Sequence, residues 1–149
     1  MNLKFYRIRK SAKLPVRAHP NDAGMDMFFC TKGGESAMSI PPGTSRVIAT
    51  GLKVEVPKGF MLEIKNKSGM ASKRQLIVGA CVIDSGYDGE ILINLHNIGE
   101  ELQVIMPGEK LAQAVLIPII HCEVEEIMED TLNQDTQRGK GGFGSTGKW

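Results

Sequence analysis

The final twelve residues, 138–149, have side chains suited to binding a phosphate chain. Glycine is dense here, and a glycine-rich loop lets several backbone N–H groups approach the oxygens of one anion. The charged and hydroxyl donors of the segment are Arg138, Lys140, Ser145 and Thr146. Phe143, followed by Gly144, adds a flat apolar face of the kind that stacks on a nucleobase. These residue types predict a ligand with a phosphate chain at one end and a base at the other.

Two familiar phosphate-binding motifs do not fit this segment. Its glycines match the dinucleotide-binding pattern Gly139-x-Gly141-x-x-Gly144, but that motif must open a helix, and only five residues follow Gly144. A Walker loop is excluded because Ser145 stands where its lysine would be needed. On composition alone, a frayed glycine-rich tail remains the alternative.

The distribution of charge favours a functional arm over a frayed tail. Every ionisable side chain from residue 123 to residue 135 is acidic, whereas every one from residue 137 to the end is basic. The polar run at 130–137 predicts a linker. The basic segment beyond it is therefore suited to close over an anion that is bound elsewhere on the protein.

Four further segments combine glycine with polar side chains: residues 23–26, 67–71, 82–90 and 108–113. Each has an ordinary structural explanation when it is taken alone. A Gly-x-Asp turn ending at Asp26 is common, residues 84–89 fit a hairpin loop, and Gln113 is able to satisfy a backbone group. Only the set as a whole, together with the C-terminal segment, is specific.

Short runs in which apolar and polar residues alternate dominate the chain around these segments. Such alternation is typical of half-buried strands, which are predicted at residues 46–50, 52–56, 59–65, 76–83, 91–95 and 112–119. Glycine and proline turns separate them, so we expect an all-β fold, a distorted jelly roll or β-barrel. Residues 68–74 are predicted to form a short helix, with Ser68 as its N-cap and its N-terminal N–H groups facing an anion.

Length and composition predict one globular domain in a reducing compartment. The chain has 149 residues, of which 42% are hydrophobic, enough for a single core. Its net charge of +1 disfavours a nucleic-acid-binding surface. Cys30, Cys81 and Cys122 are odd in number and widely spaced, so we expect free thiols and a cytoplasmic protein. No membrane-length apolar run or signal-peptide core is present, so we expect a soluble, intracellular protein without a membrane partner.

In their order and spread, the five segments resemble the five motifs of the homotrimeric dUTP pyrophosphatases (dUTPases), from residue 23 to residue 147. The resemblance implies hydrolysis of dUTP to dUMP and pyrophosphate by attack of water on the α-phosphorus. Mg²⁺ is then expected to bridge the triphosphate, held by phosphate oxygens and water without direct protein ligands. It also implies a jelly-roll domain at 1–130, a flexible linker and closing arm at 131–149, and a homotrimer whose sites are shared by three subunits.

The same resemblance implies a role for each polar motif residue. Asp84 matches the general base, Gln113 the amide that orients water or phosphate, and Asp26 a carboxylate associated with the metal-bound triphosphate. Ser68 matches the hydroxyl that bonds the triphosphate near the leaving oxygen. Residues expected to contact the substrate are Lys67, Ser68, Gly69, Val78, Gly79, Cys81, Ile83, Tyr87, Arg138, Phe143, Gly144, Ser145 and Thr146.

The resemblance also implies recognition of the uracil base and the sugar at a hairpin formed by residues 78–87, which resembles the uracil pocket of the family. Its main-chain groups would match the uracil edge and leave no space for the thymine methyl group. Tyr87 would lie under the sugar and exclude a ribose 2′-OH, and Phe143 would stack on the base and close the site.

Two residues depart from the family pattern, and two other functions remain open. Lys67 stands where arginine is usual, which keeps the charge and loses the bidentate fork. Cys81 stands where glycine is common, beside the uracil-binding backbone. The related dCTP deaminases have a catalytic glutamate at the position of Asn94, which disfavours deamination. A non-catalytic nucleotide sensor is the second alternative, and intact Asp84 and Gln113 disfavour it.

Overall fold

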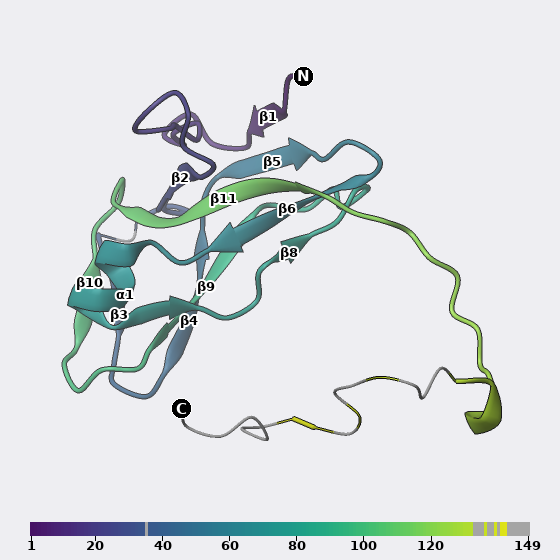
Figure 1. Cartoon of the computed structure of the whole chain (residues 1–149). Coiled ribbons are helices and arrows are strands. Elements are labelled where there is room, and N and C mark those ends of the chain that lie inside the picture. Colours follow the sequence, from purple (N-terminus) through teal and green to yellow (C-terminus); the bar gives the residue numbers. More distant parts are fainter. Residues whose placement is uncertain (35, 133–135, 137–138, 140, 143–149) are drawn as a thin grey trace.

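The computed structural model describes the chain except residues 35, 133–135, 137–138, 140 and 143–149. Strands dominate it and one short α-helix is present, which confirms the predicted all-β class (Figure 1). The elements are β1 (Lys4–Arg7), β2 (Met25–Phe28), β3 (Met38–Ile40), β4 (Ser45–Ala49), β5 (Leu52–Glu55), β6 (Phe60–Lys65), α1 (Ser68–Arg74), β7 (Leu76–Val78), β8 (Val82–Ile83), β9 (Leu92–Asn97), β10 (Gln103–Ile105), β11 (Lys110–Pro118) and a 3₁₀ turn, η1 (Glu129–Thr131). No helix of the described part is long and apolar enough to cross a membrane.

Strands that are distant in sequence pair in antiparallel sheets. The largest sheet has the order β2-β11-β6-β8, a second has the order β4-β9-β7, and two strand pairs join β1 to β5 and β10 to β3. This order of non-consecutive neighbours is typical of jelly rolls and not of a simple meander. In the described part of the chain the sheets stay separate and do not close into a barrel, which agrees with the jelly roll of the prediction.

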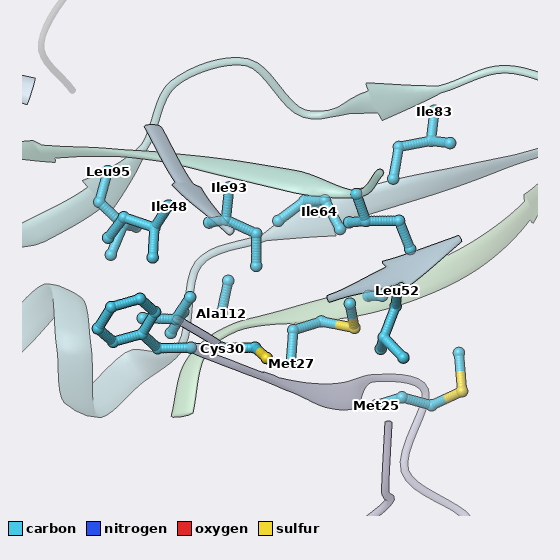
Figure 2. Packing of buried hydrophobic residues seen from close by; sticks show 14 of the residues in the cluster. Met25, Met27, Cys30, Ile48, Leu52, Ile64, Ile83, Ile93, Leu95 and Ala112 are labelled. Atoms are coloured by element: carbon cyan, nitrogen blue, oxygen red, sulfur yellow. The ribbon is translucent and has the colours of Figure 1, made fainter. Parts of the chain in front are cut away.

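One apolar core is shared by these sheets. Figure 2 shows side chains from different strands converging, among them Met27 of β2, Ile48 of β4, Leu52 of β5 and Ile93 of β9. All four are fully buried. On β9 every second side chain is buried, because neighbouring residues of a strand point to opposite faces. The core therefore fixes β2 and β11, which carry candidate site residues.

Five of the six predicted strands are confirmed with shifts of one or two residues at their ends, as β4, β5, β6, β9 and β11. The prediction of one strand at 76–83 is wrong, because β7 pairs with β9 whereas β8 pairs with β6. Gly79 N–H donates to Asn94 C=O at 2.9 Å, and Cys81 C=O accepts from Ile64 N–H at 2.7 Å. The chain therefore passes from one sheet to the other around Ala80.

The segment after β11 leaves the sheets. Ile119 N–H still donates to Gly59 C=O at 2.9 Å, and residues 120–132 run away from the strands (Figure 1), where Ile120 and Val124 are 94% and 98% exposed. The candidate arm residues Arg138, Phe143, Gly144, Ser145 and Thr146 lie outside the described residues. The division into a domain at 1–130 and an arm at 131–149 therefore stays a prediction.

Candidate active site

Asp26 lies at the centre of a charged cluster on β2. It is 5% exposed, and both carboxylate oxygens are bound by lysine. Lys67 Nζ is 2.5 Å from Oδ1, and Lys110 Nζ is 2.7 Å from Oδ2. We call Asp26, Lys67, Lys110 and Gln113 the Asp26 cluster. Two ammonium groups against one carboxylate leave this cluster with an excess positive charge, which suits the binding of an anion.

The electrostatic environment keeps Asp26 ionised. Burial acts to raise its pKa, but hydrogen bonds and charge from Lys110 and Lys67 outweigh burial and lower the pKa below its ordinary value. Each ammonium has three N–H donors, of which Asp26 takes one. The remaining donors of Lys67 and Lys110, whose side chains are 28% and 50% exposed, are able to reach a bound phosphate.

The lowered pKa of Asp26 predicts how stability depends on pH. A carboxyl group with a depressed folded pKa stabilises the protein above its unfolded pKa of about 3.9, and this stabilisation is lost as the pH falls through the folded pKa. Asp26→Asn should therefore cost about 2 kcal/mol at neutral pH. The Tm difference from the unchanged protein should narrow as the pH falls below about 4. Thermal melts between pH 7 and pH 2 measure this difference.

Glu55→Gln is the matched control for this measurement. It removes a carboxylate from an ion pair with Lys4 in which both side chains are 71% exposed, so little effect on Tm is expected. A Tm difference between Asp26→Asn and the unchanged protein that stays constant from pH 7 to pH 2 would show that the ionised Asp26 carboxylate does not stabilise the fold.

Gln113 on β11 lies opposite Asp26 in the sheet register. Its Nε2 donates to the main-chain carbonyl of Asn66 at 3.0 Å. A Cβ at Gly24 would lie 2.0 Å from Gln113 Oε1, so the amide packs directly against Gly24. The orientation of Gln113 is therefore fixed from two sides. Asn66 also accepts from Val78 N–H at 2.6 Å, which ties Gln113 to the segment expected to bind the base.

The residues that precede α1 differ from the prediction in one respect. Lys67, with extended φ and ψ, is the N-cap of the helix, and Ser68 is its first residue, so the prediction of a Ser68 cap is wrong. No side chain caps the helix, because the ammonium of Lys67 has no acceptor for the N–H groups of the first turn, and it donates to Asp26. Ser68 and Gly69 are exposed, which leaves the Ser68 hydroxyl free of any capping role.

Asp84 and Tyr87 lie together in a turn after β8. Tyr87 N–H donates to Asp84 C=O at 3.2 Å, and Tyr87 Oη donates to Glu90 C=O at 3.1 Å. The ring lies against Gly89, where a Cβ would be 2.1 Å from Oη. A cavity of about 250 Å³ is lined by Val82, Ile83, Asp84, Tyr87, Glu90, Ile91 and Leu92. This turn therefore presents a carboxylate and an aromatic ring to one small cavity.

The expected base-binding segment, residues 78–87, is not a two-stranded hairpin, because β7 and β8 do not pair with each other. Val78 and Ile83 belong to different sheets, as described above. A Cβ at Gly79 would lie 2.2 Å from Asn94 Oδ1 and 2.4 Å from His96 Nε2, so these side chains would have to move if a larger residue stood there. The N–H groups of Val78 and Gly79 both donate within the chain, so a base would meet other main-chain groups. Cys81 is half-buried.

Sequence reasoning missed Lys110 of the Asp26 cluster and Asn66, which accepts from Gln113 of this cluster. Lys110 was within a recognised segment, but a register shift between Lys110 and Ala112 decides that it reaches Asp26. Asn66 directly precedes the segment at 67–71 and gave no signal of its own. In the described part of the chain, no side-chain hydrogen bond or ion pair connects the Asp26 cluster with Asp84 or Tyr87.

Comparisons with known proteins agree on one family. The dUTPase family model matches residues 10–147. A deoxyuridine 5′-triphosphate nucleotidohydrolase of Clostridium tetani is 42% identical, over 98% of this chain and 97% of the relative. The human mitochondrial enzyme of that name is 35% identical, over 99% of this chain and 56% of its own length.

Solved structures agree with the sequence relatives. A dUTPase of Staphylococcus bacteriophage 80alpha, solved with dUPNHPP, superimposes with a TM-score of 0.83 and 28% identity over 98% of each chain. A mutant dUTPase of phage phi11 of S. aureus, which coordinates a structural Mg(II) ion, gives a TM-score of 0.77 and 26% identity, over 87% of this chain and 98% of its own. Family model, relatives and fold together show that the chain belongs to the dUTPase family.

Proposed function

We propose that the protein is a dUTP diphosphatase, which hydrolyses dUTP to dUMP and pyrophosphate. In a cell this reaction limits uracil incorporation into DNA and supplies dUMP for dTMP synthesis. The observation that carries the proposal is the Asp26 cluster, in which two lysines share one buried carboxylate next to a fixed glutamine. Its excess positive charge suits a triphosphate, and the family match supports dUTP as the nucleotide.

In the proposed mechanism, each side chain acts on water or on phosphate. Asp84 accepts the proton of the water that attacks the α-phosphorus, and Gln113 orients that water or the phosphate. Lys67 and the Ser68 hydroxyl donate to phosphate oxygens as the pyrophosphate departs. Asp26 holds the ammonium groups of Lys67 and Lys110 in place. No covalent nucleophile is needed.

The donor set fits Mg²⁺ that is held through substrate phosphates and water. Among the described residues, no group of three or more His, Cys, Asp or Glu side chains is placed to hold a metal ion. Both oxygens of Asp26 already accept from lysine, so this carboxylate is suited to support the triphosphate and not to bind a cation directly. When bound, Mg²⁺ would neutralise charge on the phosphate oxygens.

The proposal includes a homotrimer with shared sites. Val82 and Leu92 line the cavity at Asp84 and are 54% and 39% exposed, and Val47 on neighbouring β4 is 59% exposed. Apolar side chains gathered on a surface are typical of subunit interfaces. A neighbouring subunit would then bring its phosphate-binding residues to the turn at Asp84, and the arm of a third, with Arg138 and Phe143, would close the site.

Two other functions on this fold can be separated by one experiment. In a dCTP deaminase a catalytic carboxylate would stand at Asn94, but Asn94 Oδ1 is 2.8 Å from His96 Nε2 and packs against Gly79. Incubation with dUTP and with dCTP, with Mg²⁺ present, should release pyrophosphate from dUTP and no ammonia from dCTP. Ammonia would identify a deaminase, and turnover of neither nucleotide would identify a sensor.

The three free cysteines support a reducing, cytoplasmic location.

Discrimination at the sugar tests the role proposed for Tyr87. The hydrogen bond to Glu90 and the contact with Gly89 hold the ring in one position. A fixed ring excludes a 2′-OH by overlap, so dUTP should be strongly preferred over UTP, and also over dTTP. Tyr87→Ala should narrow the dUTP/UTP gap by about 1–3 kcal/mol of transition-state discrimination. The measurement is kcat/KM for both nucleotides.

Asp88→Asn serves as the control for Tyr87→Ala. The Asp88 side chain lies on the same loop but is 92% exposed and contacts Lys53. This variant should leave the dUTP/UTP ratio unchanged. A ratio that stays constant in Tyr87→Ala as well would make Tyr87 a structural residue of the turn.

A further inference from the structure

A partly buried ion pair joins the N-terminal segment to the loop that carries Asp84 and Tyr87. The guanidinium of Arg9 donates to both carboxylate oxygens of Glu90, through NH2 to Oε1 and through NH1 to Oε2 at 3.4 Å. The two side chains are only 20% and 16% exposed. A planar guanidinium against a planar carboxylate fixes orientation as well as distance.

Glu90 is also held by the main chain next to β5. Its Oε1 accepts from Gly51 N–H at 2.8 Å. Gly51 has a φ of 71° and a Cβ there would lie 2.7 Å from Ala12, so this stretch is tightly packed. The residue after Glu90, Ile91, donates its N–H to Leu52 C=O at 2.8 Å. Glu90 is therefore anchored on both its side chain and its adjoining backbone.

The main-chain carbonyl of Glu90 connects this ion pair to the candidate active site. It accepts the hydroxyl of Tyr87, whose own N–H closes the turn on Asp84. A continuous series of contacts thus runs from Arg9 through Glu90 and Tyr87 to Asp84. The side chains of Arg9 and Glu90 are engaged with each other and with Gly51, so they would act through the loop and not directly on the nucleotide.

We propose that Arg9 and Glu90 are positioning residues for dUTP hydrolysis, which hold the Tyr87 ring and the Asp84 turn in their reactive places. This inference rests on the roles proposed above for Asp84 and Tyr87. Small displacements matter here, because an error of about 1 Å in the position of a catalytic group can cost roughly 10²-fold in rate. Arg9 lies outside the segments that the sequence singled out, and Glu90, the last residue of the segment at 82–90, was given no role there.

The alternative is an ion pair that only stabilises the fold. Such a pair would lower Tm when it is broken and leave the chemistry unchanged at temperatures where the variant is folded. The loop offers an internal comparison, because Lys53 and Asp88 also form an ion pair, at 3.0 Å, and Asp88 is 92% exposed. Exposed ion pairs of this kind contribute little to the stability of the fold.

The test measures kcat and KM for dUTP and UTP in the full-length protein, well below the Tm of each variant. Arg9→Ala should lower kcat for dUTP by about 10- to 100-fold and narrow the dUTP/UTP ratio of kcat/KM. Glu90→Gln keeps the shape and the acceptor for Gly51 but removes the charge, so a smaller change in the same direction is expected. The Glu90→Gln variant also tests the proposal if Arg9→Ala does not fold. Asp88→Asn should match the unchanged protein.

A double variant shows whether the pair acts through Tyr87. Tyr87→Phe removes the hydroxyl that binds Glu90, so its effect on the dUTP/UTP ratio should be non-additive with that of Arg9→Ala. Additive effects would overturn the proposed route. A lower Tm with unchanged kcat and ratio in both Arg9→Ala and Glu90→Gln would overturn the inference alone. An unchanged kcat in Asp84→Asn and an unchanged dUTP/UTP ratio of kcat/KM in Tyr87→Ala would instead overturn the roles proposed for these two residues. This inference would then fail with them.

Discussion

Asp84→Asn should hydrolyse dUTP roughly 10²- to 10⁴-fold more slowly than the unchanged protein, with little change in nucleotide affinity. Asparagine keeps the shape of the side chain but cannot accept a proton from water. Asp84 is exposed at the cavity after β8, so it is placed to meet a bound nucleotide. Single-turnover and steady-state kinetics give kcat, and titration with a non-hydrolysable dUTP analogue gives the affinity.

Asp88→Asn is the matched control, since it makes the same chemical change four residues further along the same loop. Near-normal kcat is expected there, because Asp88 is exposed and contacts only Lys53 among the ion pairs of the described residues. Turnover in Asp84→Asn that equals the control would refute the assignment of the general base. The slow variant should also retain dUTP long enough for the complex to be crystallised.

Deletion of residues 137–149 should lower activity by roughly two orders of magnitude or more and leave Tm and assembly nearly unchanged. The buried residues of the apolar core lie between Ala12 and Ala114, so the deletion removes none of them. It does remove the phosphate donors Arg138, Ser145 and Thr146 and the aromatic ring of Phe143. Activity, thermal melts and sedimentation of the truncated and full-length proteins measure the three quantities.

Two further measurements sharpen the arm experiment. Phe143→Ala in the full-length protein separates stacking from phosphate binding, and it should lose less activity than the deletion. Trp149 is the only tryptophan, so its fluorescence should change when a non-hydrolysable dUTP analogue binds with Mg²⁺. Loss of the trimer on deletion would contradict the independence of the arm from folding, and an unchanged fluorescence signal would argue against ordering near Trp149.

The local sequence pattern was sufficient to predict strands that have one buried and one exposed face. The alternation at 52–56 predicted β5 and that at 91–95 predicted β9, because a period of two residues is a property of the strand itself. β2 was missed because all four of its side chains are buried, so it has no alternation to detect. The division of 76–83 into β7 and β8 was missed because it depends on the partners Asn94 and Ile64.

The sequence by itself determined the chemistry available to this protein. Glycine-rich segments with Asp26, Ser68, Asp84 and Gln113 are local features, and their order along the chain was enough to predict the dUTPase family and a phosphate-binding site. These features can be recognised in the sequence because residue type and spacing do not depend on the fold.

Only the tertiary structure decided which charges meet. Lys110 reaches Asp26 because a register shift in β11 places it there, and Asn66 joins Gln113 to Val78 because β6 lies beside β11. Arg9 and Glu90 are far apart in sequence, and their ion pair exists because the chain near β1 packs beside the loop before β9. Hydrogen bonds and ion pairs act over a few ångströms, so contacts between distant residues follow from packing and leave no local pattern in the sequence.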